Sequence, residues 1–362
     1  MKIGELCSYA PKSQIKAGEA IEGAKYMFFT SSADENKRYS DYQFDGEGII
    51  MGTGGNATLH YYSGKYSTST DCVVLLPNEK VRCKYLYYYL KANMNVLEAG
   101  FKGAGLKHTN KKYINDICID NIPDCGKQDK IIYILDKIQD IIDAKNKELK
   151  LLDDLIKARF VEMFGDPVSN SYGLPEATLP ELGEFGRGIS KHRPRNDPKL
   201  LGGDYPLIQT GDVANAGLYI TSYNSTYSEF GLKQSKMWEK GTLCITIAAN
   251  IAKTAILTFD ACFPDSVVGF TSNEKTNNIF IHYWFLFFQA ILESQAPESA
   301  QKNINLKILS ELRAIVPEKE KQDEFVDFIH QVDKSKVVYM YILKTRKYLM
   351  YNGEYREKVN CI

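Results

Sequence analysis

The feature that most constrains this chain is an internal repeat. Residues 107–129 (KHTNKKYINDICIDNIPDCGKQD) resemble residues 301–323 (QKNINLKILSELRAIVPEKEKQD). The offset between matching residues is 195 up to a one-residue gap and 194 after it, which places Lys127–Asp129 on Lys321–Asp323. Because a duplicated sequence folds as a duplicated structure, the chain is predicted to form two related halves.

The similarity extends in both directions from this segment. Upstream, Asp71–Val74 corresponds to Asp265–Val268. Downstream, apolar residues recur in a heptad frame, which is typical of a coiled coil, although a helix packed in an ordinary bundle can show the same pattern. The predicted seam residues are Ile131, Leu135, Ile138, Ile142, Leu149, Leu152, Ile156, Phe325, Ile329, Val332, Tyr339, Leu343 and Met350.

The heptads predict two long helices. The first contains no Gly or Pro from Lys127 to Phe164 and is ended by Gly165–Pro167, so it would be roughly 50 Å long. The second has a more polar seam, with Lys336 and Arg346 in core-type positions, and is predicted to end near residue 353. Since neither helix can bury its stripe alone, we expect them to pair with each other.

The segments before each helix are rich in short β-like runs bounded by turn residues. These runs are Gly48–Gly52, Thr70–Pro77, Tyr205–Gln209, Thr242–Ile247 and Ser266–Thr271. Each segment ends in one predicted helix, Cys83–Asn95 or Asn278–Ser294, with an aromatic cluster that could pack on a sheet or stack on bases. Packing is favoured, because both clusters precede the repeated segment. The predicted fold class is α+β, with domains at 1–126 and 166–320 and long helices at 127–165 and 321–362.

Composition and motifs limit the possible functions. Lys+Arg and Asp+Glu both number 45, which excludes a uniformly basic or an acidic disordered chain but not local basic patches. No signal core or membrane-length apolar run is evident, so a cytoplasmic location is expected. The eight cysteines form no CxxC pair, and the sequence lacks a phosphate-binding loop, HExxH and GxSxG. We therefore expect no catalytic residue, no metal site and no cofactor in this chain.

Two loops carry an excess of positive charge. One is Lys102–Lys112 and the other is Arg187–Lys199 (RGISKHRPRNDPK). Such loops can neutralise phosphates and reach base edges, although a solvated loop without a partner is the alternative for each. The candidate DNA-binding residues are Lys102, Lys107, His108, Lys111 and Lys112 in the first half, and Arg187, Lys191, His192, Arg193 and Arg195 in the second.

In this order, the motifs resemble the specificity subunits of Type I restriction-modification enzymes. Gln301–Asn305, followed by Ile315–Pro317 and Lys321-Gln322, resembles the family's boundary between a target-recognition domain and its long helix. Phe160–Pro167 resembles the exit from the central helix, and Tyr205–Asp212 resembles an early strand and turn of such a domain. The resemblance covers essentially the whole chain.

The resemblance implies two target-recognition domains that each read one half of an interrupted sequence in double-stranded DNA. It implies that the two long helices form an antiparallel coiled coil with pseudo-two-fold symmetry, which spaces the readers and docks methyltransferase subunits. Those subunits bring S-adenosylmethionine, and a motor–nuclease subunit can join them to cleave DNA. The chain itself would be a non-catalytic, phage-defence DNA-binding subunit.

Two other interpretations remain open. The chain could be a decoy or regulatory scaffold with the same fold that does not read DNA, in which case no methyltransferase would copurify with it. It could also be an enzyme with an unrecognised site, which would require a cluster of titratable residues. A neighbouring gene for an adenine methyltransferase would favour the specificity subunit over both.

Overall fold

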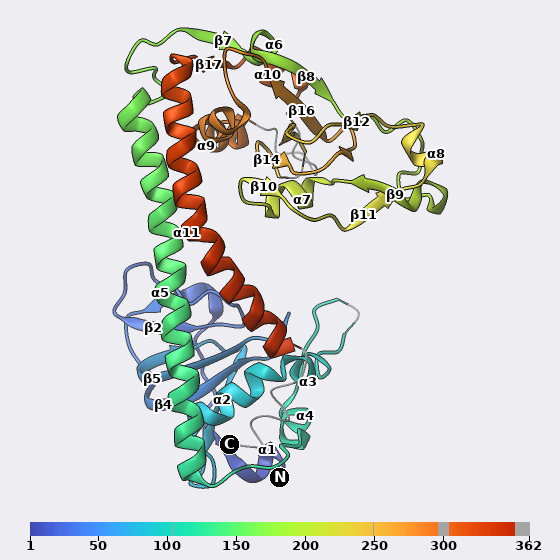
Figure 1. Ribbon diagram of the computed structural model, residues 1–362. Helices are drawn as coiled ribbons and strands as arrows, with labels where there is room; N and C mark the ends of the chain where they lie inside the picture. Colours follow the sequence, from blue (N-terminus) through green and yellow to red (C-terminus); the bar gives the residue numbers. More distant parts are fainter. Residues whose placement is uncertain (104, 249, 296–303, 352–362) are drawn as a thin grey trace. The chain divides into compact units, whose positions relative to one another are not determined.

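A computed structural model describes residues 1–103, 105–248, 250–295 and 304–351, except for the side chains of residues 294–295 and 337–351. The described residues divide into two compact units: the first comprises residues 1–145 and 343–351, and the second comprises residues 146–342. Each unit has its own sheet and its own apolar core (Figure 1).

The first unit is built on a six-stranded sheet with the order β1-β6-β4-β5-β2-β3. All neighbouring strands are antiparallel except β5 and β2, which run parallel. The strands are β1 (Cys7–Tyr9), β2 (Tyr26–Phe29), β3 (Arg38–Tyr39), β4 (Phe44–Gly52), β5 (Leu59–Thr68) and β6 (Cys72–Pro77). The short helices are α1 (Ile3–Leu6), η1 (Ala17–Glu19), α2 (Cys83–Ala92), α3 (Met94–Glu98) and α4 (Lys111–Asp116).

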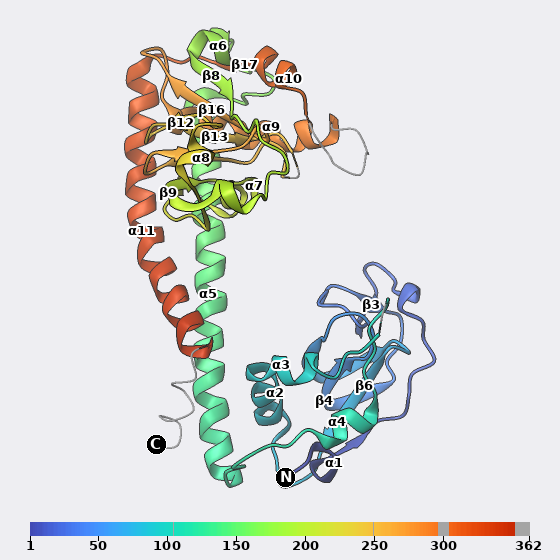
Figure 2. The same cartoon turned by 90° about the vertical axis from the view of Figure 1, so that its right-hand side faces the viewer.

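Helix α2 covers one face of this sheet and lies between the sheet and the start of the long helix α5 (Cys125–Phe164) (Figure 2). Leu86 and Leu90 are buried on its sheet side, in one apolar cluster with Ile49 and Leu75. The tyrosines of this helix are half-buried, so packing on the sheet, rather than base stacking, accounts for its aromatic cluster. The prediction of one helix over Cys83–Asn95 was wrong, because Asn93 ends α2 and α3 begins at Met94.

The second unit is built on a five-stranded sheet with the order β10-β14-β13-β16-β8. Its sheet strands are β8 (Gly183–Arg187), β10 (Tyr219–Ile220), β13 (Leu243–Thr246), β14 (Thr254–Leu257) and β16 (Val267–Ser272). Its helices are α6 (Leu179–Leu182), η2 (Pro198–Leu200), α7 (Thr210–Asn215), α8 (Glu229–Leu232), α9 (Asn278–Gln295), α10 (Leu306–Glu311) and α11 (Lys319–Tyr351). Strands β7 (Glu176–Thr178) and β17 (Arg313–Ile315) pair with each other.

The two sheets repeat the same connectivity. In both, the central strand (β4 or β13) is antiparallel to the next two strands of its own sheet. The first of these, β5 or β14, is also parallel to an earlier strand, β2 or β10. Asn110 and Asn305, which match in the sequence, accept hydrogen bonds at the starts of α4 and α10. The predicted α+β fold and the internal repeat are therefore confirmed.

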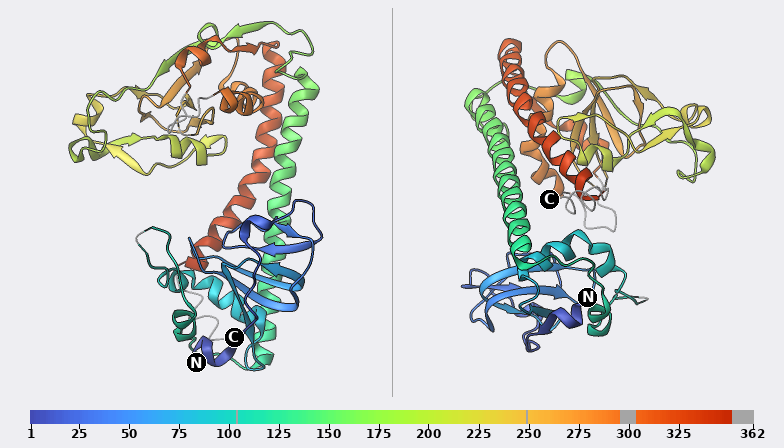
Figure 3. Two further views of the ribbon diagram at one scale, coloured as in Figure 1. Left: turned by 180° about the vertical axis from the view of Figure 1, so that it is seen from behind. Right: turned by 60° about the horizontal axis from the view of Figure 1, so that its bottom comes forward.

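The second unit adds a four-stranded sheet that the sequence did not predict beyond one strand. Its order is β11-β9-β15-β12, formed by β9 (Leu201–Leu207), β11 (Ser225–Tyr227), β12 (Met237–Trp238) and β15 (Ala261–Cys262). Residues around 201–237, coloured yellow-green, lie on the side of this unit away from α5 and α11 (Figure 3).

Within the second unit, the end of α5 and the start of α11 run antiparallel. The rings of Phe160 and Phe325 are 5.3 Å apart, and the Lys336 ammonium lies 2.6 Å from the Asp153 carboxylate. This ion pair explains how a lysine is accommodated in a seam position. Ile142, Ile156, Phe325, Ile329 and Val332 are buried, and Ile131, Leu135, Ile138, Leu149 and Leu152 are half-buried. Tyr339, Leu343, Arg346 and Met350 lie outside the described side chains.

Candidate nucleic-acid interface

The first basic loop closes against the turn that follows β4. The backbones of Lys102 and His108 exchange two hydrogen bonds of 3.0 Å, and the Gly55 amide donates to the Lys107 carbonyl at 2.9 Å. A Cβ on Gly54 would lie 3.1 Å from the His108 ring, so the turn needs glycine there for the loop to approach this closely. Backbone bonds therefore fix the loop ends, while its lysine side chains remain exposed.

The lysine side chains of this segment are exposed. Lys102, Lys107 and Lys112 are exposed, and among the described residues none of their ammonium groups pairs with a carboxylate. The ammonium of Lys111 lies 4.4 Å from the centre of the Tyr9 ring, which is a cation–π contact. Two exposed lysines in the loop and Lys112 in the first turn of α4 together suit the neutralisation of DNA phosphates.

Lys37, which lies outside the predicted loop, adds a cation beside it. The Ser31 hydroxyl donates to the Gly54 carbonyl and accepts from the Gly54 amide, which brings the segment after β2 beside the loop. In that segment the Lys37 ammonium donates to the Thr30 hydroxyl at 3.0 Å. The sequence could not reveal this neighbour, because only the parallel pairing of β2 with β5 brings the segment to this edge.

The second basic loop follows β8 and is stabilised by acidic residues. The His192 ring lies 2.8 Å from the Asp197 carboxylate, and Asp197 also accepts from the Lys199 backbone amide at 3.0 Å. The Lys199 amide and, second, His192 lower the pKa of Asp197 below its usual value. The loop therefore contains a folded turn rather than a free chain.

The arginines of the second loop share a carboxylate from another strand. Arg193 lies 3.4 Å from Asp265, and Arg195 forms a closer bond to the second carboxylate oxygen. Arg193 also donates to the carbonyls of Ser190 and His192 at 2.5 and 2.9 Å. Asp265, which lies 70 residues further along the sequence than Arg195, lowers the net charge of this loop below the value counted from its own residues.

The two loops come from different points of the repeat but lie at the same edge of the equivalent sheets. In the first unit, Thr109 donates to the Thr53 carbonyl at 3.0 Å, just beyond the end of β4. In the second, Gly188 donates to the Val267 carbonyl at 2.9 Å, where β16 begins opposite the end of β13. Strand pairing therefore places the candidate DNA-binding residues of both loops at the same end of the strands in the two equivalent sheets. Whether these ten residues contact DNA stays a prediction.

Among the residues whose placement is described, no three His, Cys, Asp or Glu side chains come together as a metal site. His60 is buried against Glu35 and the Ser32 carbonyl, and His282 is buried against Thr254, so these histidines serve separate packed regions. No helix in the described part of the chain is long and apolar enough to cross a membrane.

Comparison with known proteins identifies the family of this chain. The sequence model of the Type I restriction modification DNA specificity domain matches residues 1–153 and 176–338. The Type I restriction enzyme EcoDI specificity subunit of Escherichia coli is 22% identical over 157 residues, covering 43% of this chain and 34% of that protein. The MjaVIII specificity subunit of Methanocaldococcus jannaschii is 26% identical over 137 residues, covering 38% of this chain and 32% of that protein.

The chain therefore spans about a third of the length of these two curated relatives. The crystal structure of a Type-I restriction-modification system S subunit from M. genitalium shares the fold, with a TM-score of 0.60 and 14% identity. The match covers 97% of this chain and 93% of that one. The resemblance predicted from the sequence is confirmed, and the chain belongs to the family of Type I restriction-modification DNA specificity proteins.

Proposed function

We propose that this chain reads double-stranded DNA as a non-catalytic specificity subunit, with one half-site for each unit. The observation that carries the proposal is the placement of two basic loops, from different parts of the repeat, at the corresponding edge of two equivalent sheets. Duplicated readers suit an interrupted target, because each sheet edge presents cations and hydrogen-bonding groups of its own.

The cations and the base-reading groups have different roles in this proposal. Lys102, Lys107 and Lys112 carry free charge and would bind phosphates, which gives affinity without sequence preference. Arginine is the best bidentate reader of guanine, so Arg187 and the two arginines held by Asp265 are the candidates for base contacts. Sequence preference would then arise from these arginines and not from the lysines.

The partners follow from the family and from the long helix. We infer that methyltransferase subunits dock on the helices and carry S-adenosylmethionine, and that a motor–nuclease subunit joins where the system cleaves. The exposed apolar side chains of α5 support a docking role, because apolar patches on a surface favour a protein partner. These are Tyr133, Ile134 and Ile141 in the first unit, and Leu151 and Leu155 in the second.

Methylome sequencing of cells with and without the gene tests this function directly. We expect an interrupted, adenine-methylated motif to disappear on deletion while a neighbouring methyltransferase gene is still expressed. An unchanged methylome under that condition would contradict the proposal and favour the decoy or regulatory scaffold.

A charge variant of the full chain tests the first loop. Replacing Lys102, Lys107 and Lys112 with Gln should weaken binding to duplex DNA and reduce the slope of log K against log salt by about 3. The control replaces Lys80, Lys127 and Lys130, three exposed lysines that follow β6 or lie in the first turns of α5, where Lys127 pairs with Asp124 at 3.7 Å. Equal losses in both variants would mean that binding does not use this edge.

A further inference from the structure

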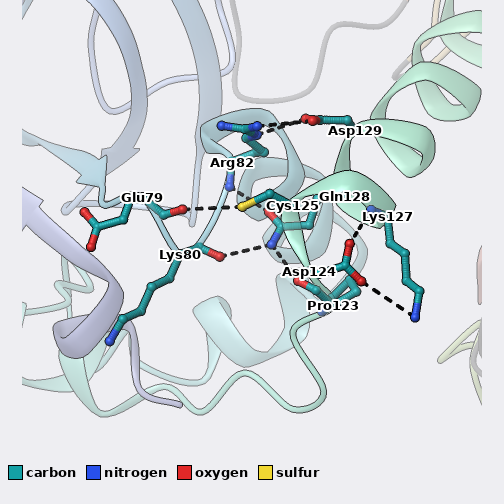
Figure 4. A network of polar contacts seen from close by, with 9 residues as sticks. All are labelled: Glu79, Lys80, Arg82, Pro123, Asp124, Cys125, Lys127, Gln128 and Asp129. Atoms are coloured by element: carbon teal, nitrogen blue, oxygen red, sulfur yellow. Dashed lines mark hydrogen bonds and ion pairs between the residues drawn. The ribbon is translucent and has the colours of Figure 1, made fainter.

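The start of each long helix is held by a buried glutamine that belongs to the internal repeat. The side-chain amide of Gln128, which is 0% exposed, donates to the carbonyls of Lys80 at 3.0 Å and Pro123 at 2.7 Å. Its oxygen accepts from the Arg82 backbone amide at 2.7 Å (Figure 4). Two of these three hydrogen bonds reach the segment between β6 and α2, and the third reaches Pro123, just before α5.

Gln322 makes the corresponding contacts in the second unit. Its amide donates to the carbonyls of Lys275 and Pro317, both at 2.9 Å, and its oxygen accepts from the Thr276 hydroxyl at 2.9 Å. It is also 0% exposed. The repeat has therefore kept a similar attachment of helix to globule at both places, and the partners Pro123 and Pro317 correspond in the alignment.

Beyond the glutamine, the first unit holds its helix by charges. The Arg82 guanidinium donates two bonds to Asp129, at 2.9 and 3.2 Å (Figure 4). One turn or more further on, Asp136 accepts from Lys84 at 2.7 Å and from Tyr88 at 2.5 Å. Arg82 and Asp129 are about half exposed, with side-chain exposures of 50% and 54%, so water and salt reach this pair.

The second unit holds its helices by aromatic packing instead. Phe325 of α11 is 0% exposed, and its ring lies 5.3 Å from that of Phe160 and 5.5 Å from that of Tyr283 on α9. Residues of both long helices belong to the core cluster of this unit. In the first unit, by contrast, no described residue of α5 belongs to the core cluster that contains Ile49, Leu75 and Leu86.

This difference has a physical consequence. Packing of buried rings is insensitive to salt, whereas half-exposed ion pairs are screened by it. In the first unit, the hydrogen bonds of Gln128 and the ion pairs of Arg82 and Lys84 link α5 to α2 and to the segment before it. The attachment of α5 to the first unit is therefore the one that salt can weaken.

We propose that Arg82 and Lys84 are positioning residues, which fix the direction of α5 from the first unit and thereby set the spacing between half-sites that the protein accepts. We call the attachment of α5 to the first unit the joint. Gln128 lies at its centre, and the aromatic packing in the second unit is the corresponding rigid attachment. The effect on spacing rests on the proposed DNA-reading function, whereas the polar character of the joint does not.

Hydrogen exchange on the full chain tests the joint without DNA. In the variant R82Q/K84Q we expect the amides of residues 129–140 to exchange roughly fivefold faster than in the wild type at low salt, because two ion pairs are lost. High salt should accelerate exchange in the wild type toward the same rate and change the variant little. Unchanged exchange in the variant at low salt would overturn the proposal.

The matched control is R159Q, which removes the pair between Arg159 and Glu324 at 2.9 Å in the second unit. Because Phe325 remains packed there, we expect exchange in residues 319–332 to change little. If R159Q accelerates exchange in the second unit as much as R82Q/K84Q does in the first, the attachment in the second unit is not the more rigid one. The proposed difference between the two units would then be wrong. A conservative R82K/K84R variant should restore most of the protection, which separates charge from side-chain shape.

Methylome sequencing supplies the functional readout for R82Q/K84Q. We expect the methylated motif to keep its half-site bases and to accept additional spacer lengths. Loosened exchange with an unchanged spacer would overturn the positioning role. If no methylated motif depends on the wild-type chain, the proposed DNA-reading function is wrong. Hydrogen exchange still shows whether ion pairs hold α5 to the first unit.

Discussion

At the scale of single residues, the second basic loop is defined by an acid that lies outside it. Asp265 holds Arg193 and Arg195 from the start of β16, so two of the predicted cations are already paired. Its counterpart in the repeat, Asp71, is exposed, and within the described residues its carboxylate pairs with no cation. Equivalent positions of the internal repeat therefore differ in their electrostatic role, because Asp265 pairs with two arginines and Asp71 does not.

This pair gives a prediction for D265N. Removing the carboxylate should free both guanidinium groups for phosphates, so that non-specific duplex binding tightens several-fold and the salt slope steepens by about 1 to 2. Binding titrations at several salt concentrations measure both quantities. D71N is the control, and an equal change in both variants would mean that general charge, not the arginine pair, is responsible.

A second residue-scale prediction concerns His282, which is fully buried. Burial first, and then the nearby charge of Lys336, lower the pKa of His282 from 6.5 to about 4. Because the folded pKa lies below the unfolded value, stability is complete above pH 6.5 and falls as the pH drops toward 4. The loss across this window is on the order of 3 kcal/mol.

Tryptophan fluorescence can follow this effect, because both tryptophans, Trp238 and Trp284, lie in the second unit. The free energy of unfolding of the wild type should fall between about pH 7 and about pH 5, and H282Q should show a flatter dependence on pH. Parallel pH profiles for the two proteins would show that His282 does not supply the dependence.

At the scale of elements, the antiparallel helices are stabilised by rings at one end and tolerate charge along the seam. Phe160, Phe164 and Phe325 are buried with α9, whereas Lys336 reaches Asp153 with its side chain 19% exposed. Burial of an aromatic ring is worth more than a partly exposed ion pair. The more polar second seam therefore does not prevent pairing within the second unit.

The two kinds of contact should respond differently to substitution. F325A should lower the free energy of unfolding of the second unit by about 3 to 5 kcal/mol, because it leaves a cavity among three rings. K336L should change it by less than about 1 kcal/mol. Urea unfolding followed by tryptophan fluorescence distinguishes them, and a larger loss in K336L would reverse this ranking.

At the scale of the whole molecule, two units with the same sheet connectivity carry different basic segments. The first has exposed lysines between α3 and the first turn of α4, and the second has arginines after β8. Because each loop depends on contacts within its own unit, changes in one should leave the other's contacts intact. Independent evolution of the two halves of a target is compatible with such an arrangement.

Methylome sequencing can test this independence. R187Q/K191Q should alter base preference or occupancy in one half of the motif, and K107Q/H108A should alter only the other half. Both variants leave the long helices untouched, and R187Q changes only the exposed side chain of the last residue of β8. A variant that changes bases in both halves would contradict the assignment of one half-site to each unit.

The repeat, the fold class, the two long helices and the family could be predicted from the sequence, because duplicated segments and heptads are local patterns. Five predicted runs became strands, but β5 and most of the four-stranded sheet were missed, since tyrosine- and glycine-rich or very short strands lack clear alternation. Only the tertiary structure decided that Asp265 faces Arg195, and that Gln128 holds the segment before α2. These partners lie tens of residues apart, so sheet register and burial, rather than any local pattern, bring them together.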